Sequence, residues 1–187
     1  MKHLLQRKNV LTSLLLICVT FSLAHAQNKK PIKGPTIKGY GPVFAVKDRA
    51  KKLPQNFQYK VVFDVLSSAK DPQQLNRRLE SIARFINMLT INQVPLKNIH
   101  IAAVFHGKAT SNLLKNSVYH ARFNTDNPNI NLLHQLNQNG VEFYVCGQSV
   151  AFPGFKKSDL IYPQSLALSA MTTFVILQQQ GYQLLPD

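Results

Sequence analysis

The sequence predicts a three-layer α/β domain over residues 57–187, with a mostly parallel sheet of about five strands and helices on both faces. Short apolar runs alternate with longer segments of helical periodicity, which is the pattern of a parallel sheet. Glycine or proline separates most of these segments, and no repeat or second hydrophobic block argues for another domain.

The first half of this domain contains two expected strands with a helix between them. The apolar runs 59–66 and 98–105 predict the strands. We expect Asp71 to cap the helix, with Pro72 at its first position, because apolar residues then recur at helical spacing over 75–89.

The second half repeats the alternation. Glycine suits the left-handed conformation that commonly ends a helix, so Gly140 and Gly181 each mark such an end. We expect, in chain order, a short helix at 110–116, a helix begun by Asn129 or Asn131, a strand at 140–145, an apolar helix at about 165–180 and a strand at 182–185.

The first 26 residues are typical of an export signal. Three basic residues precede an apolar stretch at 10–23, which ends in the Ala24-His25-Ala26 pattern that signal peptidases read. We expect cleavage after Ala26, which places the mature protein in the periplasm or outside the cell. A lipoprotein acylated at Cys18 would need small residues just before that cysteine, where the sequence has Leu15-Leu16-Ile17. An uncleaved membrane anchor would need about 20 apolar residues, and the stretch at 10–23 is shorter.

Residues 27–56 differ in composition from the rest, and we call them the basic arm. They carry eight basic residues against one acidic residue, a net charge of +7, interleaved with proline and glycine. Such a segment cannot build its own core, so we expect less regular structure than anywhere after it, with Tyr40, Val43 and Phe44 as docking points. The basic arm either holds an anionic envelope surface or is a solvated leader. Nucleic acid is not an expected partner, because aromatic residues are not interleaved with the basic ones.

Cys146 is the only cysteine that remains after the expected cleavage. Structural cysteines in exported proteins normally pair, so a lone thiol is a candidate for chemistry. It follows the strand at 140–145 and precedes Gly147-Gln148-Ser149, which predicts a turn into a helix. The backbone N–H groups and dipole of a helix N-terminus lower the pKa of a thiol, and Ser149 adds a hydroxyl that can donate to a thiolate or persulfide. The alternative is a buried cysteine that packs as a small hydrophobe.

His106 and Gly107 follow the second strand, so they lie at a carboxyl end, as Cys146 does. Ligands of open α/β sheets bind at these ends. If the two strands are neighbours, the imidazole of His106 reaches the thiol and stabilises the thiolate; the alternative is that His106 anchors its loop through the backbone. Gly107, Gly147 and Gln148 are the expected ligand-binding residues.

Other site chemistries lack their motifs. The four histidines after residue 26 include no pair at a spacing of three or four, and no second cysteine is available, so no metal site is expected; they are His100, His106, His120 and His134. The sequence has no Gly-x-Ser-x-Gly elbow, no glycine-rich dinucleotide fingerprint and no phosphate loop. No cofactor is therefore expected.

The residues around Cys146 also carry a family resemblance. It rests on the run 140–155 (GVEFYVCGQSVAFPGF), with support from 104–107, 167–173 and 177–182. These residues resemble the DsrE/DsrF-like family over about 57–187, which implies a Rossmann-like topology. In the sulfur-relay members of that family, the cysteine at this position receives sulfur as a persulfide and passes it on. Several members form trimers or hexamers, so the resemblance also implies a homo-oligomer.

Two classes of function stay open on the sequence. The first is a persulfide carrier with sulfurtransferase-type chemistry, in which Cys146, His106 and Ser149 are the catalytic residues. The second is a binding or oligomeric assembly module of the same fold, in which Cys146 is structural or a ligand contact. The relay proteins are cytoplasmic, whereas this chain has an expected export signal, so the resemblance names neither the sulfur donor nor the acceptor.

Overall fold

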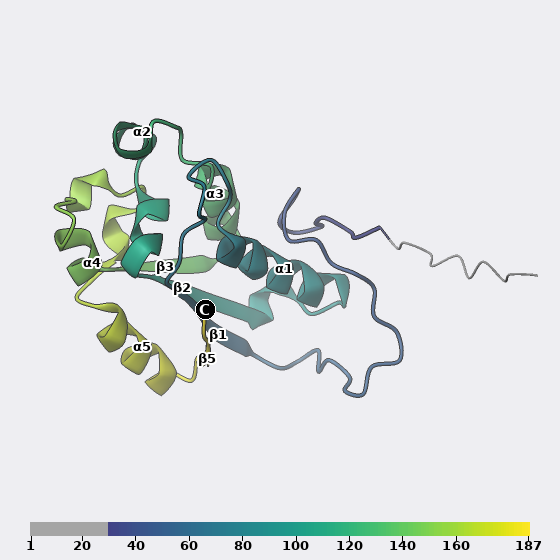
Figure 1. Ribbon diagram of the computed structural model, residues 1–187. Coiled ribbons are helices and arrows are strands. Elements are labelled where there is room, and N and C mark those ends of the chain that lie inside the picture. Colours follow the sequence, from purple (N-terminus) through teal and green to yellow (C-terminus); the bar gives the residue numbers. More distant parts are fainter. Residues whose placement is uncertain (1–29) are drawn as a thin grey trace, which may run out of the picture.

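The computed structural model describes residues 30–187 and contains a five-stranded parallel sheet in the order β4-β3-β2-β1-β5. Helices α1 and α3 cover one face and α5 covers the other (Figure 1), so the predicted three-layer α/β fold is confirmed. The strands are β1 (Tyr59–Val65), β2 (Ile99–Phe105), β3 (Val141–Cys146), β4 (Leu166–Ala167) and β5 (Gln183–Leu185). The α-helices are α1 (Arg77–Ile91), α2 (Asn116–Phe123), α3 (Ile130–Gln138), α4 (Gly147–Ala151) and α5 (Ala170–Gln179).

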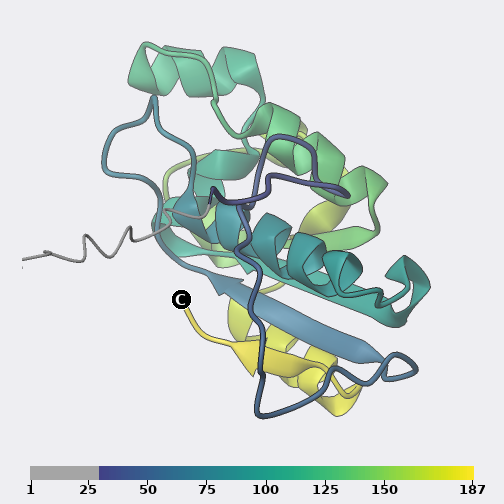
Figure 2. The same cartoon turned by 90° about the vertical axis from the view of Figure 1, so that its right-hand side faces the viewer.

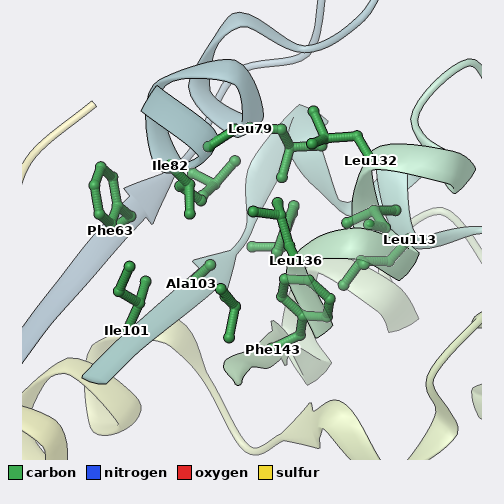
Figure 3. Packing of buried hydrophobic residues seen from close by; sticks show 14 of the residues in the cluster. Phe63, Leu79, Ile82, Ile101, Ala103, Leu113, Leu132, Leu136 and Phe143 are labelled. Atoms are coloured by element: carbon green, nitrogen blue, oxygen red, sulfur yellow. The ribbon is translucent and has the colours of Figure 1, made fainter. Parts of the chain in front are cut away.

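The larger part of the core lies between the sheet and helices α1 and α3. Successive side chains of a strand point to opposite faces, so alternate residues of β1, β2 and β3 meet these helices. Figure 3 shows Phe63 and Ala103 of this set together with Ile82 of α1 and Leu136 of α3. The side chains of this cluster are apolar or aromatic.

The opposite face of the sheet packs under α5 and contains the candidate thiol. On β1 and β2, the residues between those of the larger core point to this opposite face. They include Val62, Ala102 and Val104, which form a second cluster with Cys146 and with Leu177 of α5. Cys146 is the last residue of β3, so it lies at the carboxyl edge of this α5 face.

Helix α1 begins later than predicted. Asn76 is its N-cap, and the side chain of Asn76 accepts a hydrogen bond from the backbone N–H of Arg78. Asp71, the predicted cap, instead closes a local turn by accepting from the N–H of Gln73. Asn76 is buried and its own N–H donates to the side chain of Asn129. Tertiary contacts therefore decide between two residues that are equally good caps.

Two further helix predictions are wrong in their bounds. The short helix expected at 110–116 is a 3-10 helix at Gly107–Leu113, and it is followed by α2, which the sequence did not predict. Only Tyr119 of α2 is buried, so this helix has no apolar stripe to detect. The last helix begins at Ala170 because Ser169 caps it, and Leu166–Ala167 form the edge strand β4 instead.

The basic arm, from residue 30 onward, contains no helix and no strand of more than one residue, and Ile32 and Val43 form an isolated antiparallel bridge. It crosses α1 (Figure 2), where the buried side chain of Asn87 accepts from the N–H of Ile37 and donates to the carbonyl of Tyr40. Val43 is buried as expected, whereas Phe44 is 57% exposed and does not dock. The missed anchor is Ile37, which is fully buried.

The expected signal segment, residues 1–26, lies outside the described residues. Within residues 30–187, no helix has both the length and the apolar character needed to cross a membrane.

Candidate functional site

Three polar side chains lie at the carboxyl ends of the central strands, on the α5 face. Residue pairing between β2 and β3 ends at Phe105 and Val145, so one further step along each strand sets His106 beside Cys146. Neighbouring strands are about 4.8 Å apart, and the backbone of His106 is still extended, with φ −151° and ψ 178°. Asp64 of β1 belongs to the same face, because it pairs with Val104.

The sulfur of Cys146 lies where two helices begin. Cys146 is the N-cap of α4, and Ala170 is the first residue of α5. Burial acts to raise the pKa of the Cys146 thiol, since the residue is only 6% exposed. Hydrogen bonds from the Ser149 hydroxyl and from the backbone N–H groups of Ala170, Ser149 and Gln148 outweigh burial, so the pKa is lowered.

Ser149 connects the thiol to the loop after β2. Its hydroxyl oxygen accepts a hydrogen bond from the N–H of Gly107 at 3.0 Å, which leaves the hydroxyl hydrogen for the sulfur of Cys146. The structure thus places two predicted site residues, Ser149 and Gly107, in direct contact with each other.

Gly147 and Gln148 hold α4 against the segment that follows β4. A Cβ atom on Gly147 would lie 2.7 Å from the carbonyl oxygen of Ala167, so only glycine fits there without a shift of the backbone. The exposed side chain of Gln148 donates to the carbonyl of Leu168. These contacts fix the donors that face the sulfur. The ligand contacts expected of Gly147 and Gln148 stay a prediction.

His106 is held by a carboxylate that sequence reasoning missed. Its Nε2 lies 2.7 Å from Oδ1 of Asp64, and its ring meets the ring of Phe174 of α5 edge-on, with centroids 6.1 Å apart. The partner of the imidazole is therefore a side chain of β1 and not the backbone of its own loop. The signal for Asp64 was an acidic residue inside the apolar strand run 59–66.

This hydrogen bond determines which ring nitrogen of His106 is available for chemistry. A neutral imidazole that donates from Nε2 to Asp64 has an acceptor lone pair on Nδ1. A thiol, an imidazole and an orienting carboxylate in this order are the groups from which activated cysteine nucleophiles are built. The backbone donors can hold the Cys146 thiolate, and Asp64 orients the imidazole that follows the neighbouring strand.

The other histidines take part in unrelated contacts. Within residues 30–187, no three metal-ligating side chains come together. His100 contacts Gln58, His120 contacts Asp126 and His134 contacts Tyr162.

Comparison with known proteins identifies the family. The model of the DsrE/DsrF-like family matches residues 60–186, which covers the sheet and its helices. The chain belongs to the DsrE/DsrF-like family. Among solved structures, the chain is similar to MTH1491 from Methanobacterium thermoautotrophicum, a protein of unknown function. The two share 19% sequence identity with a TM-score of 0.50, and the match covers 69% of this chain and 99% of MTH1491. No curated protein matches the sequence.

Proposed function

We propose that this DsrE/DsrF-like protein is a sulfur carrier that holds a persulfide on Cys146. The observation that supports this most is the sulfur's environment: a lowered thiol pKa at the start of two helices, with four hydrogen-bond donors around it. A cysteine that only packs in a core would have its pKa raised by burial.

The loading step needs no cofactor. The Cys146 thiolate attacks the terminal sulfur of a donor persulfide, R–S–SH, the S–S bond of the donor breaks, and R–S⁻ leaves with the electron pair. Cys146 now carries –S–SH. One S–S bond has formed and one has broken, so no external oxidant or reductant is required.

The unloading step is the same reaction in the other direction. An acceptor thiolate attacks the outer sulfur, and the Cys146 thiolate leaves. The donors that stabilise this thiolate make it a good leaving group, because a thiol of lower pKa leaves faster. The low exposure of Cys146 favours attack on the outer sulfur over attack on the inner one.

His106 and Asp64 have supporting roles in this proposal. His106 accepts the thiol proton of Cys146 at Nδ1, and Asp64 orients the imidazole through Nε2. The hydroxyl of Ser149 donates to the thiolate. Cys146 is the residue that touches the transferred sulfur, and Asp64 is a positioning residue.

The proposal includes export and a surface partner. Cleavage after Ala26 would release the mature chain into the periplasm or the medium, where donor and acceptor differ from those of cytoplasmic relays. The net charge of +7 on residues 27–56 suits an anionic envelope surface.

Mass spectrometry after exposure to polysulfide tests the carrier. The full chain is purified with Cys18→Ser, so that Cys146 is the only thiol. We expect a mass increment of about 32 Da, one sulfur atom, that dithiothreitol removes, and no increment when Cys146→Ser is added. A chain that gains no sulfur, or that still gains it without Cys146, would contradict the proposal.

An assembly role is the second candidate, and the exposed surface of α5 favours it. Its apolar side chains Met171, Val175 and Ile176 are more than half exposed, as is Leu168 just before the helix. Apolar surface of this kind commonly marks a subunit contact. We propose that the face is covered by a second copy in a trimer or hexamer, which is compatible with sulfur transfer.

Analytical ultracentrifugation tests this second proposal. The parent is expected to sediment as an oligomer at micromolar concentration, and Met171→Glu with Val175→Glu as a monomer. Ser117→Glu, an exposed change on α2, is the matched control. A monomeric parent would contradict self-association.

A further inference from the structure

A cavity of about 710 Å³ lies beyond the carboxyl ends of β1, β2 and β3. Its walls come from the loop after β1, the 3-10 helix Gly107–Leu113, the end of α2, and α4 with the residues after it, to which α4 contributes Gln148 and Ser149. A cavity of this size takes a ligand of drug-like dimensions. Cys146 is not among its lining residues, but Ser149 is, so the cavity and the thiol share one hydroxyl.

The cavity combines an apolar wall with positive charge. Phe123, Phe152 and Phe155 supply the apolar surface, and Phe152 is 94% exposed. Lys108 and Arg122 supply two cationic groups, and no acidic residue lines the cavity. Within residues 30–187, neither cation forms an ion pair.

Arg122 is held in place by aromatic rings. Its guanidinium lies 5.1 Å from the ring centroid of Phe155 and 5.9 Å from that of Phe123. Among the described residues, no hydrogen bond uses the guanidinium N–H groups, so they are free to bind an anion in bidentate fashion.

Thr110 lines the cavity but is only 2% exposed, and its Oγ1 has no hydrogen-bond partner among the described residues. A buried hydroxyl without a partner is costly. Because this oxygen is closed to solvent, an occupant of the cavity does not reach it, and Thr110 contributes only to the wall.

We propose that this cavity is a binding site for an amphipathic organic anion, a carboxylate or sulfonate with an apolar body. The acidic group binds Arg122 and Lys108, and the apolar body packs on Phe152 and Phe155. The site stands apart from the proposed sulfur chemistry, because none of these four residues contacts Cys146. The occupant of the cavity reaches Ser149, whose hydroxyl donates to the sulfur of Cys146, so the two sites are adjacent.

Isothermal titration calorimetry with 2-naphthalenesulfonate tests the site, and 2-naphthalenesulfonamide serves as the probe without the charge. We expect the sulfonate to bind the full chain about fivefold more tightly than the sulfonamide, since one solvent-exposed ion pair contributes up to about that factor. Arg122→Gln should lower this preference, because only Lys108 then remains to bind the acidic group. Arg122 is exposed, so the change leaves the fold intact.

Three control variants distinguish binding in this cavity from binding elsewhere on the chain. Lys157→Gln removes an exposed cation outside the cavity, and Met171→Gln disrupts the apolar surface of α5; both should bind the sulfonate as the parent does. Cys146→Ser should also bind it, so that failure of the sulfur carrier and failure of this site are distinguishable. Equal affinity for the two probes, parent-like binding by Arg122→Gln, or weaker binding by Met171→Gln would each overturn the proposal.

Discussion

Asn87 is the residue on which docking of the basic arm depends, and Asn87→Ala tests that dependence. The Asn87 side chain makes five hydrogen bonds to the backbone of residues 36–41, and three of them are buried. A buried hydrogen bond contributes a net of about 1 kcal/mol, so losing these three should lower the free energy of unfolding by about 3 kcal/mol. Urea unfolding measures the change.

Limited trypsin digestion shows whether the loss occurs at the basic arm. Lys38 lies in the docked loop, where Gln135 of α3 binds both its N–H and its carbonyl, whereas Lys52 is exposed and beyond the loop. Cleavage after Lys38 should accelerate in Asn87→Ala while cleavage after Lys52 keeps its rate. Asn131→Ala, an exposed change on α3, is the matched control. Unchanged stability together with unchanged cleavage after Lys38 would rule out this role of Asn87.

Three further predictions concern the site and the cavity beside it. Ser149→Ala should shift the alkylation of Cys146 by iodoacetamide to higher pH, because the variant keeps the burial that raises the pKa of the thiol and loses a hydrogen bond that lowers it; an unchanged pH midpoint would contradict this. Gly147→Ala should lower the free energy of unfolding by about 2 kcal/mol, measured in urea, because its Cβ would meet the carbonyl of Ala167; parent-like stability would show that the backbone gives way freely. Thr110→Val should raise stability by about 1 kcal/mol, since it removes a buried hydroxyl without a partner, and a loss of stability would mean that the hydroxyl is satisfied.

The central strands β1 and β2 could be predicted from the sequence because both of their faces are largely buried. Both are mostly apolar runs, and their predicted bounds differ from the structure by one residue. β3 was also predicted from a short apolar run, although Glu142 on its other face is exposed. The position of Cys146 at the start of α4 followed from this strand. The family resemblance, confirmed over residues 60–186, added the fold topology.

The missed elements lack a local signal. β4 has only two residues, too few to show a period, and α2 has one buried residue. The exposed apolar residues of α5, such as Met171, make that helix apolar on all sides, so periodicity could not locate its start. Within the site, the contact between His106 and Asp64 depends on the pairing of β1 with β2, which composition and spacing do not specify.

The release of sulfur is the decisive property of a carrier, because a carrier must give up what it binds. The Cys18→Ser chain is loaded with polysulfide, separated from excess reagent and mixed with 2-mercaptoethanol, and both products are identified by mass spectrometry. We expect free Cys146 and the persulfide of the small thiol, since the buried inner sulfur directs attack to the outer one. A mixed disulfide between Cys146 and the small thiol, with release of hydrosulfide, would contradict the carrier.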